Sequence, residues 1–360
     1  MQQVISTTPT PINVTASGMQ APAGTGKSFL NYIHYFRGIS ILYVVAAHPL
    51  LKWPEGDPTQ RILHIIFQNS TVMFIFIAGY LFQHLSKNFE YKSYLIKKVQ
   101  NVICPYLIVS IPILIYRIIY KDVPGFTLAV HPDFATFPIG RQITYYMLHG
   151  AHMQQLWFVP MISLFYLGSP LLIYMDRHPR LYWLLIPLFF VSLFIIQRAA
   201  LAETFKMAAH FLSAYIFGML LSHYKDRFME IAKKYWLLIT VLAFASVIVN
   251  FYMPAKYYDT VDYTQKILFC CFYIYWLWKL DKYVPKILGL FASLSFGIFF
   301  FHYHFVLLQR RISYMFYGHE MPGTLLNWIL CYLSIIIPTV LLLLLAKRIL
   351  GKNSKYFIGC

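Results

Sequence analysis

The chain has 360 residues, of which 59% are hydrophobic and only 12% are charged. A soluble globule of this size needs more polar surface than this composition supplies, so a soluble fold is excluded. The net charge of +17 comes from Lys and Arg residues dispersed between apolar segments. This dispersion is typical of cations beside anionic lipid, and it excludes nucleic acid as a partner. The composition therefore predicts an all-α, multi-pass membrane protein.

The first 28 residues are rich in Ser, Thr, Pro and Gly, and they lack the basic start and short apolar core of a secretory signal. We predict a disordered cytoplasmic tail at 1–28 and one membrane domain at 29–360. The five cysteines show no metal-ligand spacing, so no metal site is expected.

Ten apolar segments follow the tail, and each is long enough to cross ~30 Å of hydrocarbon. They lie at about 30–51, 62–84, 99–120, 156–175, 181–198, 207–223, 235–253, 264–280, 288–308 and 323–347. Lys and Arg are more frequent in the connections on the side of the N-terminus than on the other side. The positive-inside rule then predicts a helical bundle of about ten spans with both termini cytoplasmic.

The longest connection between these segments is at about 120–155. It has no obvious regular structure, and connections of this length are usually functional or flexible. We expect it to shape the outer side of a cleft in the bundle.

Arg37 and His48 lie in the first apolar segment, within YFRGISILYVVAAHPL. On a continuous helix their spacing makes roughly 20° more than three full turns, so both side chains project from one face, ~16 Å apart along the axis. Ionisable residues are expensive inside a membrane and mark functional sites by default. The pair predicts a polar cleft, and an anionic ligand suits Arg37 because acidic residues are scarce. The alternative for His48 is a helix-end histidine that hydrogen-bonds a neighbouring span.

Three other histidines are candidates for the surroundings of this cleft. His34 precedes Arg37 by three residues and shares its face, either as a second polar wall or as an interfacial residue. His302 and His304 lie near the end of the ninth segment. Two residues apart on a helix, they point about 200° away from each other, so at most one of them readily faces the cleft.

The stretch YFRGISILYVVAAH resembles the first helix of the integral-membrane acyltransferase family 3, in which Arg and His are separated by ten residues. Four further stretches occur in the order of that family, and the resemblance covers about residues 30–360. They are FIFIAGYLF at 74–82, LIKKVQNVICPYL at 95–107, LWFVPMISLFYLGSP at 156–170 and SLSFGIFFFH at 293–302.

The resemblance implies an O-acyltransferase that moves an acyl group, most often acetyl, from cytoplasmic acyl-CoA to a hydroxyl of a sugar, polysaccharide or lipid-linked glycan. Arg37 would contact the phosphates of coenzyme A or polarise the thioester carbonyl, and His48 would be the general base. A covalent acyl-histidine is the alternative route. The ~16 Å separation on a straight helix favours Arg37 on the donor and His48 nearer the point of transfer.

Lys97 and Lys98 are candidates for binding coenzyme A. Relatives often carry Arg-x-x-Arg before the proline of the third segment, whereas this chain has Lys98 and Asn101 at those positions. A lysine meets phosphate as a point charge and lacks the bidentate geometry of arginine. Trp157 and Tyr166 match the pattern of the fourth segment. We expect them to pack behind the residues that contact the ligands.

Two other functions remain open at this point. A transporter or flippase also carries intramembrane charges, although the chain shows no repeated halves. A noncatalytic subunit of a polysaccharide-export assembly would keep the Arg–His pair for packing alone. For the acyltransferase, the expected partners are acyl-CoA, a sugar or polysaccharide acceptor, membrane lipid and other polysaccharide-synthesis proteins. The absence of a eukaryotic targeting signal favours a bacterial plasma membrane, the inner membrane.

Overall fold

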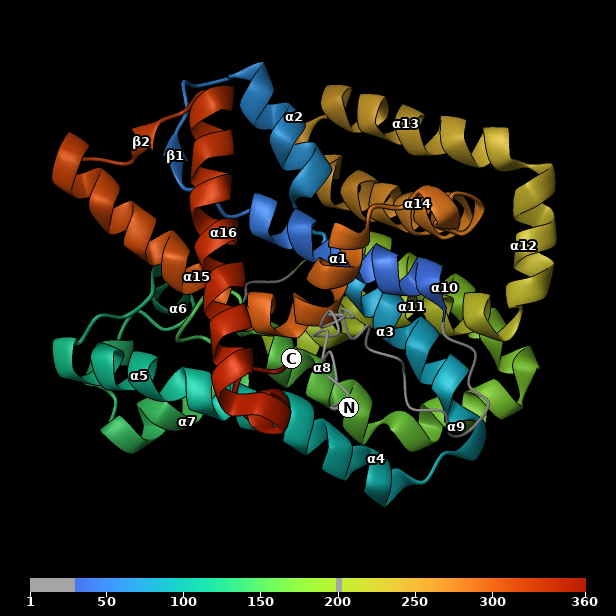
Figure 1. Ribbon diagram of the computed structural model, residues 1–360, viewed down its shortest axis with the longest axis horizontal. Helices are drawn as coiled ribbons and strands as arrows, with labels where there is room; N and C mark the ends of the chain where they lie inside the picture. The colour runs from blue at the N-terminus through green and yellow to red at the C-terminus, as the bar shows by residue number, and fades with distance from the viewer. Residues whose placement is uncertain (1–29, 199–202) are drawn as a thin grey trace, which may run out of the picture.

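The computed structural model describes residues 30–198 and 203–360, so the predicted tail at 1–28 lies outside the described residues. Helices make up most of the described chain (Figure 1). The α-helices are α1 (Asn31–Ala46), α2 (Pro58–Phe67), α3 (Thr71–Leu85), α4 (Tyr91–Lys98), α5 (Cys104–Tyr120), α6 (Gly125–Leu128), α7 (Ile139–His149), α8 (Phe158–Leu167), α9 (Ser169–Arg177), α10 (Leu185–Phe190), α11 (Thr204–His223), α12 (Lys225–Lys234), α13 (Trp236–Tyr252), α14 (Tyr258–Lys279), α15 (Lys286–Tyr317), α16 (Leu325–Leu350) and α17 (Ser354–Phe357).

Shorter elements join these helices. Two are π-helical, η2 (Val99–Ile103) and η5 (Val191–Ile195). The 3₁₀ segments are η1 (Ser86–Asn88), η3 (Phe134–Thr136), η4 (Pro179–Leu184), η6 (Ala255–Tyr257), η7 (Asp281–Tyr283) and η8 (Gly351–Asn353). The strands β1 (Leu51–Lys52) and β2 (Met321–Pro322) form a short parallel pair that ties the chain after α1 to the chain after α15.

Membrane-spanning capacity is concentrated in fewer helices than the ten predicted. Within the described residues, five segments are long and apolar enough to cross a membrane, or up to seven if α8 with α9 and α12 with α13 each form one bent span. The five are Pro58–Asn88, Tyr91–Tyr120, Thr204–His223, Lys286–Tyr317 and Leu325–Phe357. The all-α membrane architecture is confirmed, whereas the count of ten and the cytoplasmic termini stay predictions.

The predicted segments break where local chemistry opposes a long helix. Helix α1 ends at Ala46, before Pro49, since proline lacks an N–H and disfavours helix in the residue before it. The segment at 181–198 divides into η4, α10 and η5. Helices α8 and α9 meet at Gly168 with a bend of 54°.

The connection at 120–155 is more regular than predicted. It contains α6, η3 and α7, and the 11-residue α7 is amphipathic, with Tyr146 buried. The expectation of a stretch without regular structure was wrong because short amphipathic helices have too few apolar residues to resemble a span. In Figure 1, α5, α6 and α7 gather at one end of the long axis and α12 lies at the other.

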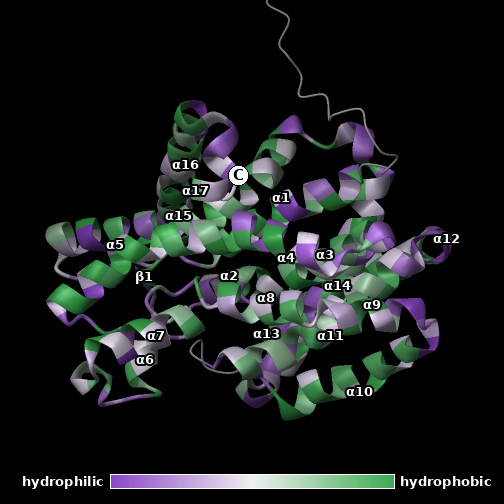
Figure 2. Cartoon of the chain, turned by 90° about the horizontal axis from the view of Figure 1, so that it is seen from below, coloured by the Kyte–Doolittle hydropathy of each residue, from purple (hydrophilic) through white to green (hydrophobic). Residues whose placement is uncertain are grey.

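The helices on the surface of the bundle differ in hydropathy. In Figure 2, α10 is largely apolar, whereas α12 is mainly polar. Large aliphatic side chains are exposed on α5 and α16, including Ile119 at 67% and Leu341 at 61%. Such exposure is costly in water and ordinary against lipid tails. These helices therefore present lipid-facing surfaces.

Helices α3 and α11 cross in direct backbone contact. A Cβ at Gly79 would collide with the carbonyl oxygen of Tyr215, and a Cβ at Gly218 would collide with the carbonyl oxygen of Phe76. Small residues at a crossing allow such close approach between membrane helices. This crossing holds α3 in place, and α3 forms one side of the site described below.

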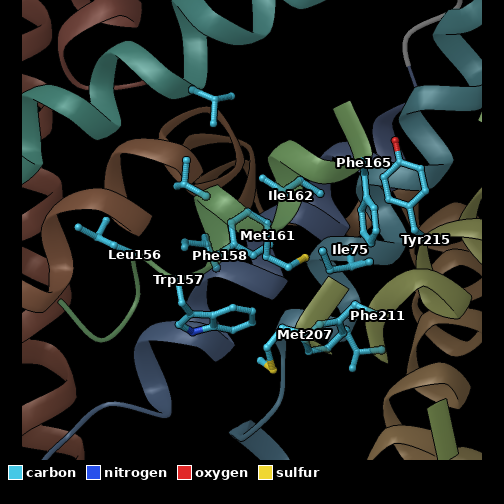
Figure 3. Close-up of a cluster of buried hydrophobic side chains, with 14 of the residues drawn as sticks. Ile75, Leu156, Trp157, Phe158, Met161, Ile162, Phe165, Met207, Phe211 and Tyr215 are labelled. Carbon is cyan, nitrogen blue, oxygen red and sulfur yellow. The ribbon is translucent and has the colours of Figure 1, made fainter. Parts of the chain in front are cut away.

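The central core lies between α8, α3 and α11. Figure 3 shows Trp157 beside Met207 and Phe211, with the side chains of α8 filling the space toward Tyr215. The rings of Trp157 and Phe211 stack with centroids 5.9 Å apart. This packing fixes the start of α8, which borders the two cavities of the site.

Candidate active site

Arg37 projects from α1, which packs tightly against α15. A Cβ at Gly38 would lie 2.5 Å from the carbonyl oxygen of Leu288, so the glycine after Arg37 lets the two helices approach. The Nε of Arg37 is buried and has no hydrogen-bond partner among the described residues. One terminal guanidinium nitrogen lies 3.5 Å from Nδ1 of His34. A guanidinium only donates, so Nδ1 of His34 accepts and its ring proton sits on Nε2.

Arg37 lines a cavity of about 490 Å³, which we call the Arg37 cavity. Lys97 and Lys98 of α4 and Asn101 of η2 also line it, together with the polar residues Ser86, Asn88, Glu90 and Ser93. Nζ of Lys98 lies 4.8 Å from the ring centroid of Tyr166, and a second ring, Tyr94, flanks it at 5.1 Å. The aromatic faces hold the ammonium at the cavity wall by cation–π attraction.

The charge of the Arg37 cavity is strongly positive. Its acidic lining residue is Glu90, whose carboxylate accepts hydrogen bonds from the backbone N–H groups of Lys92 and Ser93 at the start of α4. Within residues 30–198 and 203–360, no carboxylate forms an ion pair with Arg37, Lys97 or Lys98. Uncompensated cations around a cavity at least partly shielded from water favour an anionic ligand.

A π-helical turn shapes this wall. Residues Val99–Ile103 are π-helical and join α4 to α5, which begins with Cys104 and Pro105. Widened turns of this kind occur frequently at functional sites. Here the turn places Asn101 on the same cavity as Lys97 and Lys98.

His48 lies beyond the end of α1, not on it. The helix closes at Ala46, and the backbone N–H of His48 donates to the carbonyl of Val45. The predicted separation of ~16 Å assumed a helix that continues to His48, whereas α1 ends two residues before it. Nε2 of Gln68 donates to the carbonyl of Ala47, which ties this turn to the connection between α2 and α3.

Two aromatic residues of α15 contact His48. The rings of His48 and His302 have centroids 5.1 Å apart, and Tyr303 meets His48 edge-on at 5.5 Å. His302 is fully buried, and its Nδ1–H donates to the carbonyl of Ile298. Its Nε2 has no partner among the described residues. His304 instead stacks on Phe301 and lines neither cavity of the site.

His48 lines a smaller cavity of about 100 Å³, which we call the His48 cavity. Amides and hydroxyls form most of its polar lining, and Arg198 adds a cation. The polar or charged lining residues other than His48 are Gln68, Asn69, Ser70, Thr71, Gln154, Gln155, Arg198 and Ser295. Trp157 contributes an aromatic wall from the start of α8.

The two cavities share three walls. Phe74 of α3, Phe158 of α8 and Phe296 of α15 line both the Arg37 cavity and the His48 cavity. We call these residues the phenylalanine seam. All three are apolar, and they form a wall that the two cavities share.

The predicted site residues therefore fall into two groups. Arg37, Lys97, Lys98 and Tyr166 line the Arg37 cavity, and His34 touches Arg37 without lining it. His48 and Trp157 line the other cavity, with His302 against His48. No group of three or more metal-ligating side chains is present among the described residues.

Sequence reasoning missed the amides of the His48 cavity and Arg198. Isolated Gln and Asn residues have no motif of their own, and α3 had to be placed against α8 before their shared cavity appeared. The one local signal was FQNST at 67–71, a polar interruption between two apolar runs. Gln154 and Gln155 lie in the connection that we expected to shape the cleft, and they do line the His48 cavity.

The lipid-facing helices and the buried cationic interior define an integral-membrane protein with a polar site inside its bundle. Residues 30–348 match the acyltransferase domain of acyltransferase family 3. The chain belongs to this family, and it is a membrane acyltransferase of the kind that transfers groups other than aminoacyl groups. No curated protein and no solved structure matches the chain.

Proposed function

We propose that the protein is an acyl-CoA-dependent O-acyltransferase that moves an acyl group, acetyl in the first instance, to a hydroxyl of a sugar, polysaccharide or lipid-linked glycan. The observation that carries this proposal is the contact between a cationic cavity and a histidine-bearing cavity along the phenylalanine seam. One cavity suits an anionic donor, and the other suits proton transfer.

The Arg37 cavity is the proposed donor site. Coenzyme A carries its negative charge on phosphates and its acyl group at the far end of a neutral pantetheine arm. Arg37, Lys97 and Lys98 would pair with phosphate, and Asn101 would add a neutral hydrogen bond. The arm would then pass between the rings of the seam, since an uncharged chain crosses apolar walls at lower cost than a phosphate does.

His48 is the proposed general base. It takes the proton of the acceptor hydroxyl while that oxygen bonds to the thioester carbonyl carbon. The carbon–sulfur bond breaks, and the imidazolium returns the proton to the departing thiolate. The products are the O-acyl ester and free coenzyme A. A covalent acyl-histidine remains the alternative route.

Membrane placement follows from the same proposal. The donor site would open to the cytoplasm, where acyl-CoA is made, and the acceptor would be an envelope or secreted glycan or its lipid-linked precursor. A bacterial inner membrane suits this arrangement. Other polysaccharide-synthesis proteins are proposed partners, because they would supply the acceptor and use the product.

The test is transfer of label from radioactive acetyl-CoA into glycan by membranes that contain the chain. The matched control is the Arg37→Ala/His48→Ala double variant, with equal expression checked. We expect label in glycan only with the wild-type chain. If acetyl-CoA gives no transfer, succinyl-CoA is tested next. Absence of transfer from both donors would contradict the proposal. It would favour a transporter or a noncatalytic assembly subunit instead.

A further inference from the structure

Two amide side chains in the His48 cavity have unused oxygens. Oδ1 of Asn69 and Oε1 of Gln155 are buried and have no hydrogen-bond partner among the described residues. Both residues line the His48 cavity, and their exposed fractions are 6% and 4%. A buried acceptor without a partner is costly, so both oxygens are groups that a ligand with hydrogen-bond donors would satisfy.

Gln155 is fixed by its own nitrogen. Its Nε2 donates to the carbonyl of Phe300 on α15 at 3.3 Å and also lies 2.8 Å from the sulfur of Met153. The donor end of the amide is therefore used by the protein. The oxygen end is the part left for a ligand in the cavity.

Asn69 is held by an unusual backbone. Its φ is +54°, in the left-handed region that few residues other than glycine adopt, and asparagine tolerates it better than most. The N–H of Val72 donates to the carbonyl of Asn69, and Ser70 Oγ donates to the carbonyl of Phe67. The turn between α2 and α3 is thus stabilised without the Asn69 side-chain oxygen. Such backbone conformations cluster at ligand sites.

Asn69 and Gln155 line the His48 cavity, and this sets them apart from another buried amide, that of Asn250. Asn250 also has an unpaired Oδ1 and is 1% exposed, but it lies between α13 and α14, where its Nδ2 donates to Gln265. It does not line the His48 cavity. Asn250 is therefore a matched control in which an unpaired amide oxygen has no place beside His48.

The missing partners are hydrogen-bond donors. A thioester carbonyl and a phosphate only accept, so neither would satisfy the two oxygens. A hydroxyl donates and accepts, and it suits an amide in either orientation. The amide N–H groups of pantetheine are the competing donors, but they belong to a chain whose anionic end is drawn to the cations of the Arg37 cavity.

We infer that Asn69 and Gln155 are the residues that recognise the acceptor, accepting hydrogen bonds from hydroxyls next to the one that is acylated. This inference rests on the proposed function and assigns its acceptor class: a polyhydroxylated molecule with at least two hydroxyls besides the reacting one. The amides select this acceptor because a molecule without those hydroxyls leaves two buried oxygens unpaired.

The experiment measures initial rates of label transfer from acetyl-CoA, or from succinyl-CoA if that is the active donor. The acceptor is the O-deacylated glycan fraction of the cells from which the chain comes, at varied concentration. The variants are Asn69→Gly, which tolerates the left-handed backbone, and Gln155→Leu. Asn250→Ala is the control. If Gln155→Leu fails to accumulate in membranes, Gln155→Met takes its place because methionine is unbranched and similar in length.

Each variant should raise the KM for the acceptor about tenfold, the size of one lost hydrogen bond, with the donor KM unchanged. Asn250→Ala should leave both KM values unchanged. A rise in donor KM instead would overturn the inference and assign the amides to pantetheine. Unchanged acceptor KM in both variants would overturn it as well. Absence of transfer by the wild-type chain is a different failure, since it removes the proposed function and the inference with it.

Discussion

The Arg37 cavity and the His48 cavity meet at the same three phenylalanines, yet they are built from different chemistry. The first is wide and carries three cations whose charges no described carboxylate pairs. The second is about a fifth of that volume and is lined mainly by amides, hydroxyls and His48, with Arg198 as a cation. In the proposed function, anion binding and proton transfer are separated in space, so each could be altered without the other.

The strongest test of this separation is His48→Ala. We expect transfer to fall by about 10³-fold, because general-base catalysis typically contributes 10²–10⁴-fold. Binding of acyl-CoA should be retained, since every cation of the donor cavity remains. The measurement is label transfer together with equilibrium binding of labelled acyl-CoA to the purified protein.

His304→Ala is the matched control for His48→Ala. His304 is a histidine of α15 that lines neither cavity, so its loss should leave transfer within about threefold of wild type, as for a packing change. Full activity in His48→Ala would refute the assignment of the base while leaving the donor cavity intact.

Arg37→Ala should have the converse effect. We expect the Kd for acyl-CoA to rise about 30-fold, since hydrogen bonds to charged groups are worth roughly 1.5–3 kcal/mol. The variant should still turn over at saturating donor with kcat reduced far less than in His48→Ala. Arg37→Lys keeps the charge without the planar fork, and an intermediate Kd would show that geometry as well as charge matters. An unchanged Kd in Arg37→Ala would place the donor elsewhere.

The Arg37 cavity was more predictable from sequence than the His48 cavity. Arg37, Lys98 and Tyr166 lie in motifs whose order matches the family, and the structure brings them to one cavity. Helical periodicity does not extend to His48, because α1 ends at Ala46 and the chain turns before Pro49. Asn69 and Gln155 were missed because a single amide has no sequence signature and gains meaning only when distant segments pack together. The count of ten spans stays a prediction for a related reason: apolar composition does not reveal bends such as that at Gly168.

A smaller effect is expected from truncating a residue of the phenylalanine seam, which lines both cavities. Phe296→Ala removes part of the wall that the two cavities share, so we expect the ratio of butyryl to acetyl transfer to rise about tenfold, within the range for one or two methylenes in an apolar pocket. Parallel assays with the two acyl-CoA donors measure this ratio.

Phe299→Ala is the control for the seam, because Phe299 lines the His48 cavity but not the Arg37 cavity. Its truncation should change the butyryl to acetyl ratio less than Phe296→Ala does. An equal change would mean that the volume beside His48, and not the shared wall, sets the length of the acyl group.

The smallest expected effect is the difference between two neighbouring lysines of the Arg37 cavity. Lys98 is partly buried and sits against the rings of Tyr94 and Tyr166, whereas Lys97 is exposed. An exposed charge is screened by water and salt, so Lys97→Ala should raise the donor KM less than about twofold at physiological ionic strength. Lys98→Ala loses an ammonium that the rings hold in place, and we expect the donor KM to rise about fivefold.

The donor KM measured at low and high salt separates the two lysines, since the Lys97 effect should vanish at high salt while the Lys98 effect persists. Equal, salt-sensitive effects would show that the tyrosine rings do not fix Lys98 for phosphate, and that the cavity attracts its donor by net charge alone.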